Sequence, residues 1–274
     1  MDTILSHLTK AGIKTYNEKG YLTPIDAISS QEAEKFRANY YRVQKQYDMD
    51  VNPILRSKPH LVFPWLYDLV KSPAITGPVS AILGPNLLAW GTSFFAKPAN
   101  EPGFVSWHQD ANYWGLEPHD VLTAWIAFTP SVRENGCMRI VPGSHLKGSL
   151  EHKDTFSEDN LLTRGQEISV HVNEKDATDI ILSPGQMSLH HVSIVHGSDP
   201  NTSSIDRIGF AIRYISTNVK QNGGRTSATM ARGTDEYKHF DLEPYPEKEL
   251  DVNSINYRED ALKRQHEILY KGAG

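Results

Sequence analysis

A histidine and an aspartate stand two positions apart in the segment Trp107-His108-Gln109-Asp110. In an extended strand, residues i and i+2 point to the same face, so His108 and Asp110 can reach one point in space. One imidazole nitrogen and one carboxylate oxygen make two of the three ligands of a facial triad, which leaves open positions on Fe(II). The pair therefore predicts a mononuclear Fe(II) site that needs only a second histidine.

The second histidine should come from a distant strand, and His196 is the best candidate. It precedes the turn-forming run 197–201, and a further strand is expected to begin at Arg207. Each residue alone has an ordinary structural reading: a core histidine, a turn aspartate, an exposed histidine. Their combination in this order, on a β-rich background, is far more specific than any one of them.

Arg207 follows His196 by eleven positions (207 − 196). In a β-helix scaffold this spacing can carry the arginine along the next strand to the back of the same pocket. A guanidinium there would suit the distal carboxylate of a 2-oxoacid, because its rigid fork matches a carboxylate. The alternative for an arginine that opens a strand is a surface ion pair.

The elements that must position these residues are mostly strands. β-rich runs separated by turn residues follow Pro85, at 87–96, 104–108, 121–128, 138–141, 179–182, 186–191 and 207–216. Asn135-Gly136 and Pro184-Gly185 are tight-turn signals. Many short strands with few helical patterns between them predict an antiparallel sandwich or jelly roll.

The first 85 residues are predicted to be mainly helical. Ser29 and Ser30 precede a helix at 31–47 with acidic residues in its first turn, and a second helix is predicted at 73–83, ended by Gly84 and Pro85. We expect one domain, 1–274, with a helical part at 1–85, a β core at 86–217 and a C-terminal extension at 218–274. Residues 151–176 are predicted to form an insertion loop that walls the site. Residues 218–233 would either close over substrate or form a plain surface loop.

The composition of the chain limits the classes of partner that we expect. The chain has 274 residues and a formal net charge of −5, which argues against nucleic acid and anionic membranes as partners. No stretch approaches 18 uninterrupted apolar residues, so we expect no membrane span. The single cysteine, Cys137, excludes an intramolecular disulfide and favours a reducing, cytoplasmic setting. The expected partner is a small-molecule substrate, and the sequence leaves the oligomeric state open.

These motifs resemble the phytanoyl-CoA dioxygenase family of Fe(II)/2-oxoglutarate-dependent oxygenases. The resemblance runs from Gly20 to Tyr214 and is densest in two blocks. The first block, 106–145, contains WHQD, TAWIAF and ENGCMRIVPGSH; the second, 189–214, reads LHHVSIVHGSDPNTSSIDRIGFAIRY. The resemblance implies a mainly β fold, a double-stranded β-helix (cupin-like jelly roll) with flanking helices.

The resemblance also implies the chemistry. Fe(II) would be held by His108, Asp110 and His196, with 2-oxoglutarate as cosubstrate and O₂ as oxidant. The cosubstrate site implied by position consists of Arg207, Ser198, Trp125 and Gln109. Related halogenases have Gly or Ala in place of the carboxylate ligand, so Asp110 favours hydroxylation.

Three further residues are candidates for substrate contacts: Tyr113, Trp114 and Arg213. Each has a structural alternative, core packing for the aromatic residues and an ion pair for the arginine. His190 and His191 are adjacent in one strand, so at most one of them faces the site, and both are interpreted as structural.

Three classes of function follow from these residues. The first is hydroxylation of an unactivated C–H bond with release of succinate and CO₂. The second is another outcome at the same iron: desaturation, cyclisation or epoxidation. The third is a non-catalytic jelly-roll protein that only binds metal. Formation of succinate from 2-oxoglutarate would separate the third class from the other two.

Overall fold

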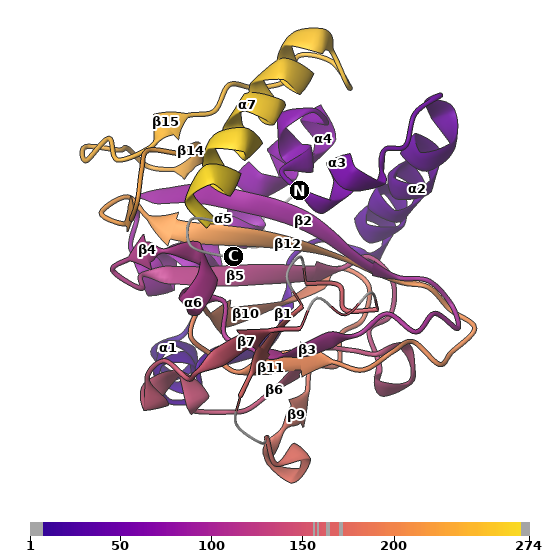
Figure 1. The fold of residues 1–274 in the computed structure, drawn as a ribbon, viewed down its shortest axis with the longest axis vertical. Helices are drawn as coiled ribbons and strands as arrows, with labels where there is room; N and C mark the ends of the chain where they lie inside the picture. Colours follow the sequence, from indigo (N-terminus) through magenta and orange to yellow (C-terminus); the bar gives the residue numbers. More distant parts are fainter. Residues whose placement is uncertain (1–7, 156, 158, 163–164, 170–171, 270–274) are drawn as a thin grey trace.

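The structure is a computed structural model that describes residues 8–155, 157, 159–162, 165–169 and 172–269. Its main sheet has seven strands in the order β1-β10-β5-β12-β2-β14-β15, all antiparallel except the last pair. Their bounds are β1 Tyr21–Asp26, β10 Gln186–His191, β5 Val121–Ala127, β12 Arg207–Ser216, β2 Leu87–Lys97, β14 Ser227–Arg232 and β15 Asp241–Leu242. Figure 1 shows these strands crossing the middle of the molecule.

A minor sheet faces the main sheet across an internal cavity that residues of both sheets line. Its order is β3-β11-β6-β9, with bounds β3 Val105–His108, β11 His196–Ser198, β6 Arg139–Ile140 and β9 Thr178–Asp179. There are also two two-stranded sheets. In one, β4 Leu116–Glu117 pairs with β13 Lys220–Gln221; in the other, β7 His152–Asp154 pairs with β8 Gln166–Ile168. The two facing sheets form the predicted jelly roll, without a closed barrel among the described residues.

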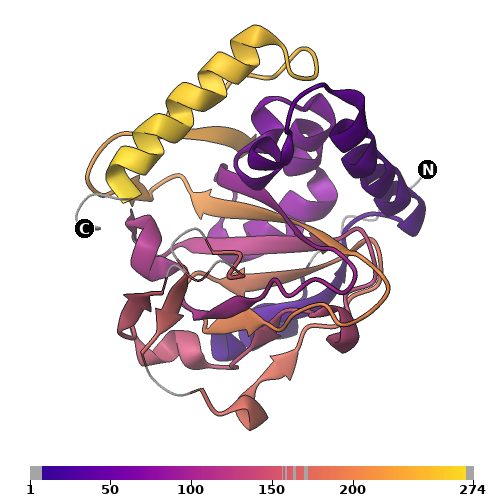
Figure 2. The same cartoon turned by 45° about the vertical axis from the view of Figure 1, so that its right-hand side comes forward.

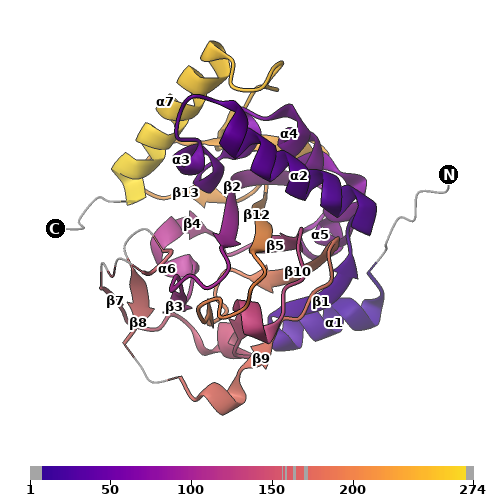
Figure 3. The ribbon, with the colours of Figure 1, turned by 90° about the vertical axis from the view of Figure 1, so that its right-hand side faces the viewer.

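The described helices are α1 Lys10–Lys19, α2 Ser30–Gln46, α3 Asn52–Arg56, α4 Pro64–Lys71, α5 Pro73–Leu83, α6 Ala111–Trp114 and α7 Val252–Leu269, with 3₁₀ turns η1 Pro59–Leu61, η2 Arg133–Asn135, η3 Ser144–Lys147 and η4 Glu174–Asp176. Helices α2 to α5 cover the other face of the main sheet (Figure 3), whereas residues of α6 and α7 line the cavity. Figure 3 shows α2 to α5 on one side of the main sheet and β3 and β9 on the other. None of the described helices is both long and apolar enough to cross a membrane.

The side chains of strand β12 alternate between the two faces of the main sheet. Its even-numbered residues Ile208, Phe210, Ile212 and Tyr214 belong to the main hydrophobic core with side chains of α4 and α5. Its odd-numbered residues Arg207, Ala211 and Arg213 line the cavity instead. Since side chains alternate along a strand, the pattern RIGFAIRY places apolar bulk under the helices and both arginines in the cavity.

Most predicted elements are confirmed. The strands at 186–191 and 207–216 and the helix at 73–83 have the predicted bounds. Helix α2 begins after Ser29, whose hydroxyl accepts from the Glu32 N–H at 3.2 Å while the Glu32 carboxylate accepts from the Ser29 N–H at 2.8 Å. This reciprocal capping box is the start that the sequence predicted.

Some predicted segments differ in the structure. The run 179–182 contributes only Asp179 to a strand, because Leu182 pairs with Ser131 in an isolated bridge outside the minor sheet. The mainly helical segment 1–85 supplies strand β1 to the main sheet. Residues 218–233, considered as a loop, contain β14, which pairs with β2. Strand pairings of this kind depend on partners far along the chain, which local patterns do not reveal.

A buried charged network ties the C-terminal segment to the helical part. Lys58 donates to a carboxylate oxygen of Glu243, and His60 Nε2 lies 3.2 Å from the other oxygen. Ser227 and Thr229 donate to the same carboxylate, at 2.8 and 2.6 Å. Burial would raise the pKa of the Glu243 carboxyl, but Lys58 and His60 outweigh burial and lower it. The network therefore contains a charged pair with its hydrogen bonds satisfied.

Replacement of Glu243 by alanine is expected to destabilise the protein by about 3–5 kcal/mol, because the Lys58 ammonium would stay buried without an acid partner. Urea denaturation at pH 7 measures this loss. Glu34→Ala, which removes an exposed pair with Arg37, is the control and should cost no more than about 1 kcal/mol. Because the pKa of Glu243 is lowered by folding, its stabilising contribution is present above about pH 4.3 and is lost as the pH falls further. Equal losses in the two variants at pH 7 would contradict the argument.

Candidate metal and cosubstrate site

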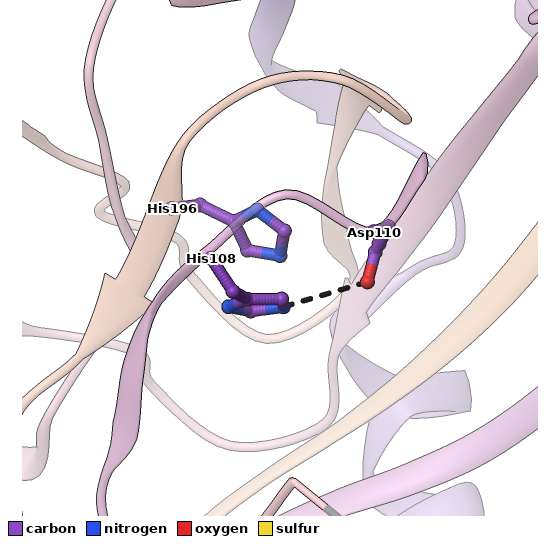
Figure 4. A group of neighbouring side chains, drawn as sticks. All are labelled: His108, Asp110 and His196. Carbon is purple, nitrogen blue, oxygen red and sulfur yellow. Dashed lines mark ion pairs between the residues drawn. The ribbon is translucent and has the colours of Figure 1, made fainter. Parts of the chain in front are cut away.

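His108 and His196 are direct partners across two strands of the minor sheet. His108 ends β3, His196 begins β11, and the antiparallel register pairs these two residues. Their ring centroids are 4.1 Å apart, and both side chains are buried. Figure 4 shows the two imidazoles side by side, with Asp110 across from them. The pairing thus joins two histidines that are 88 positions apart in the sequence (196 − 108).

Backbone carbonyls orient both imidazoles. His108 Nδ1 lies 2.9 Å from the Ser106 carbonyl oxygen, and His196 Nδ1 lies 3.0 Å from the Ile194 carbonyl oxygen. A carbonyl only accepts, so each Nδ1 carries the proton and each Nε2 keeps its lone pair. This is the arrangement that metal-binding histidines commonly have.

Asp110 reaches the histidines from outside the strand. Its backbone has helical angles (φ −62°, ψ −35°), and it is the residue before α6. The strand geometry predicted for His108 and Asp110 is therefore wrong, and a turn after β3 brings the two together instead. Asp110 Oδ1 lies 3.4 Å from His108 Nε2.

The three side chains fit one metal ion. One ligand atom from each of His108, Asp110 and His196 lies within 4.8 Å of the others. In an octahedral site with metal–ligand bonds of about 2.1 Å, neighbouring ligand atoms are roughly 3 Å apart. The three side chains therefore need to move only slightly toward one another to bind an ion. Two imidazoles and one carboxylate are the donor set of a facial triad for Fe(II).

Electrostatics favour the protonation states that bind metal. Burial would raise the pKa of Asp110, but the contact with His108 and the nearby imidazole of His196 lower it to about 2. Burial and the neighbouring His108 lower the pKa of His196 to about 4. At neutral pH the site therefore presents a carboxylate and a neutral imidazole, as cation binding requires.

Gln109 holds the metal loop from behind. Its amide nitrogen donates to the carbonyl oxygens of Ser193 (2.7 Å) and Gly148 (3.0 Å), and its amide oxygen accepts from the Leu150 N–H (2.8 Å). It is completely buried and does not line the cavity. Gln109 was expected in the cofactor site; its contacts are those of a residue that positions the neighbouring ligands.

Two buried basic side chains, Lys97 and Arg207, are partners on neighbouring strands, and Arg207 lines the same cavity. Lys97 Nζ donates to Ser198 Oγ at 2.6 Å and to the carbonyl oxygens of Ser198 and Asp199. Arg207 donates to the Gly136 carbonyl, and its Nε has no partner among the described residues. Neither cation forms an ion pair with a described carboxylate. The end of the cavity lined by Arg207 therefore carries a positive charge without a matching acid among the described residues.

The pKa values of Lys97 and Arg207 reflect their burial without an acid partner. Burial, and then the charge of Arg207, lower the pKa of Lys97 to about 6. Burial lowers the pKa of Arg207 to about 10. A bound carboxylate would offset both effects, because an opposite charge stabilises the protonated forms.

Trp125 supports Arg207. The guanidinium carbon lies 5.4 Å from the centroid of the indole ring, a cation–π contact. Gly209 leaves room for this indole, because a Cβ at position 209 would lie 1.9 Å from Trp125 Cζ2. Arg207, Ser198 and Trp125, three residues expected in the cosubstrate site, thus meet in one place.

Lys97 was not singled out from the sequence, although a signal was present. It ends the buried strand LLAWGTSFFAK, where it is the partner of Arg207 on β12. A lysine is rarely buried unless it has a partner or a function. The lysine that ends this apolar strand could therefore have been considered as a site residue.

The cavity has a volume of about 850 Å³ and continues beyond the three candidate ligands. Residues 157, 160–162 and 165 form one wall, which confirms the role predicted for the insertion. The C-terminal helix α7 supplies Leu262, Gln265 and Leu269, and its Arg258 donates to the Ser57 carbonyl at 2.8 Å. Figures 1 and 2 show α7, in yellow, beside the end of the main sheet that carries β14. Tyr113, Trp114 and Arg213, the expected substrate contacts, also line the cavity.

Comparisons with known proteins identify the family of this chain. A family model described as "Phytanoyl-CoA dioxygenase" matches residues 16–209. The "Probable alpha-ketoglutarate-dependent hypophosphite dioxygenase" of Stutzerimonas stutzeri is 26% identical over 228 residues, which cover 75% of this chain and 78% of that protein. The human "Phytanoyl-CoA dioxygenase, peroxisomal" is 24% identical over 235 residues, with 76% and 69% covered.

Solved structures also resemble this chain. A structure described as "non-heme monooxygenase; ThoJ apo" has a TM-score of 0.84 and 34% identity, with 94% of this chain and 97% of that chain covered. "CytC3 with Fe(II) and alpha-ketoglutarate" has a TM-score of 0.66 and 24% identity, with 86% and 93% covered, and supports the fold.

Proposed function

Because this chain belongs to the phytanoyl-CoA dioxygenase family, we propose that it hydroxylates an unactivated C–H bond of a small molecule, with His108, Asp110 and His196 as iron ligands. The enzyme is a 2-oxoglutarate-dependent non-haem iron dioxygenase, with Fe(II) and 2-oxoglutarate as its cofactors. One observation supports the assignment of residues: the triad opens into the same cavity as Arg207, a buried cation without an acid partner in the described part of the chain.

Each group in the cavity has a separate task. When bound, Fe(II) with 2-oxoglutarate and O₂ supplies the oxidising power, and succinate and CO₂ are released. Arg207, Lys97 and Ser198 hold the distal carboxylate of the cosubstrate; each charge-assisted hydrogen bond can contribute about 1.5–3 kcal/mol. Gln109 keeps the two ligands on either side of it in place. The aromatic walls and α7 limit the access of water to the reacting centre.

Hydroxylation is favoured over the other outcomes. Asp110 provides a carboxylate ligand and so leaves no vacancy for a halide beside the histidines. The similar structure at 34% identity is described as a monooxygenase, which is the reaction type proposed here. The cavity of about 850 Å³ is far larger than hypophosphite needs, which argues for an organic substrate.

Mass spectrometry of the products tests this proposal. Purified protein with Fe(II), 2-oxoglutarate and O₂ is expected to form succinate only when Fe(II) is present, and faster when a suitable metabolite is added. The metabolite should gain one oxygen atom. A loss of two hydrogen atoms would indicate desaturation or oxidative cyclisation, and a product of unchanged mass would indicate that the metabolite undergoes no net oxidation. Absence of succinate under all conditions would contradict the proposal.

A further inference from the structure

Three polar residues and a glycine form a row across the inner face of the main sheet next to the metal ligands. His190 on β10 pairs with Thr123 on β5, Thr123 pairs with Arg213 on β12, and Arg213 pairs with Gly91 on β2. All four residues line the cavity. The proposed reaction gives none of them a task, so their shared position calls for a separate explanation.

Arg213 is held firmly but without an acid partner. Its guanidinium donates to Ser93 Oγ at 2.6 Å and lies 5.6 Å from the ring centroids of both Phe95 and Trp114. It forms no ion pair with a carboxylate in the described part of the chain. The one acid that influences its pKa is Asp110, which the proposed function assigns to the iron. In the loaded enzyme the charge of Arg213 would therefore lack a counter-ion, a costly state inside a protein.

Other polar atoms around Arg213 also lack partners. Thr123 Oγ1 and His190 Nδ1 are buried without a hydrogen bond in the described part of the chain, although both side chains are no more than 3% exposed. Trp90 Nε1, which can only donate, is in the same condition, and its ring lies 5.3 Å from that of Trp114. Unsatisfied buried donors cost free energy, and an acceptor-rich ligand would remove part of this cost.

The cosubstrate does not account for Arg213. Arg207 and Arg213 are six positions apart on one strand, so their Cα atoms are about 20 Å apart at 3.3 Å per residue. Arg207 packs on Trp125 and Gly136, whereas Arg213 packs between Phe95 and Trp114. The two arginines have no described contact in common, so a carboxylate held by Arg207 would leave Arg213 without an anion.

The surroundings of Arg213 indicate the rest of the ligand. Trp90 and Trp114 lie beside it, and Leu262 and Leu269 of α7 line the same cavity. A cavity of about 850 Å³ leaves room for an organic body next to the cosubstrate. An acid with an apolar or aromatic body matches one cationic anchor and these apolar walls.

We propose that Arg213 binds an oxyanion of the substrate, a carboxylate or a phosphonate, and that the apolar body of the substrate lies toward α7. This inference rests on the proposed function, because it assumes that Asp110 is engaged with iron. It identifies the substrate as an amphiphilic organic acid. It also separates an anion site for the substrate at Arg213 from an anion site for the cosubstrate at Arg207.

Calorimetric titration under anaerobic conditions tests the proposal. The protein is loaded with Fe(II) and saturated with 2-oxoglutarate, so that the Arg207 end is filled and no turnover occurs. The probes are three matched sets, each an acid with its neutral amide: 3-phenylpropanoate, indole-3-acetate and decanoate, with 2-phenylethylphosphonate added to compare the two oxyanions. At least one acid should bind at least tenfold more tightly than its amide. Arg213→Gln should abolish that difference, and Arg213→Lys should restore part of it.

Controls distinguish this proposal from the proposed function. Arg232→Gln changes an exposed arginine of β14 and should leave acid binding unaltered. The affinity for 2-oxoglutarate, followed by the visible charge-transfer band of its Fe(II) complex, should change less than twofold in Arg213→Gln. Equal binding of acids and amides, or no response to any acid, would overturn the substrate site. Loss of the charge-transfer band in Arg213→Gln would assign Arg213 to the metal site instead. A wild-type protein without this band would refute the proposed function.

Discussion

Replacing His108 by alanine is expected to abolish the formation of succinate and to weaken Fe(II) binding by more than about 100-fold. Changes in the groups that merely orient metal ligands already cost 10–100-fold, so loss of a ligand should cost more. In this variant His196 loses its cross-strand partner, and only His196 and Asp110 remain as ligands, so the triad is incomplete. Asp110→Ala should have an effect of the same order for the same reason.

Metal titration followed by a succinate assay measures both effects. His119→Ala is a suitable control, because this histidine is exposed and outside the cavity. Circular dichroism of the metal-free proteins should show the same fold in all variants. If His108→Ala retained iron and turnover, the assignment of the triad would be wrong, whatever the fate of the substrate site.

Replacing Arg207 by alanine is expected to raise the KM for 2-oxoglutarate by about 10–100-fold, the equivalent of the 1.5–3 kcal/mol of a charge-assisted hydrogen bond. Iron binding should persist, because Arg207 contacts Gly136 and Trp125 and none of the three ligands. Lys97→Met should raise the same KM, and the double variant should deviate from additivity since both cations would hold one carboxylate. Initial rates at varied 2-oxoglutarate and fixed Fe(II) provide the values.

A stability measurement accompanies this prediction. Lys97 is buried without an acid partner, and burial lowers its pKa to about 6, so an ammonium at this position costs free energy in the ligand-free protein. Lys97→Met should therefore leave the thermal stability of the ligand-free protein unchanged or raise it, as is common at binding sites. Unchanged dependence on 2-oxoglutarate in Arg207→Ala would show that the cosubstrate binds elsewhere.

The fold could be predicted from local patterns in large part. The strands at 186–191 and 207–216 alternate or are continuously apolar, and the helices at 30–46 and 73–83 have clear starts or stops, so short-range interactions specify them. Strands β1 and β14 were missed, because each is an edge or near-edge strand whose pairing involves a distant segment. The reading of 218–233 as a loop failed for this reason.

The sequence alone did not predict the position of Lys97, the role of Gln109 or the neighbourhood of Arg213. A lysine at the end of an apolar strand could be exposed or buried, and only the packing of β11 beside it decides that its ammonium bonds Ser198. The place of α7 over the cavity depends on the hydrogen bond from Arg258 to the Ser57 carbonyl, which joins segments 201 positions apart.

The sequence by itself determined which residue types were available and which face of each strand they would occupy. The alternation in 207–216 separates the core residues from the two arginines, and the motif at 107–110 brings two ligands close through the chain itself. Only the tertiary structure decided that His108 and His196 share a register, because pairing strands 88 positions apart depends on the hydrophobic faces of the whole sheet. It also decided that Arg207 meets Lys97 while Arg213 stands apart with unsatisfied donors, since burial and charge compensation are properties of the packed chain.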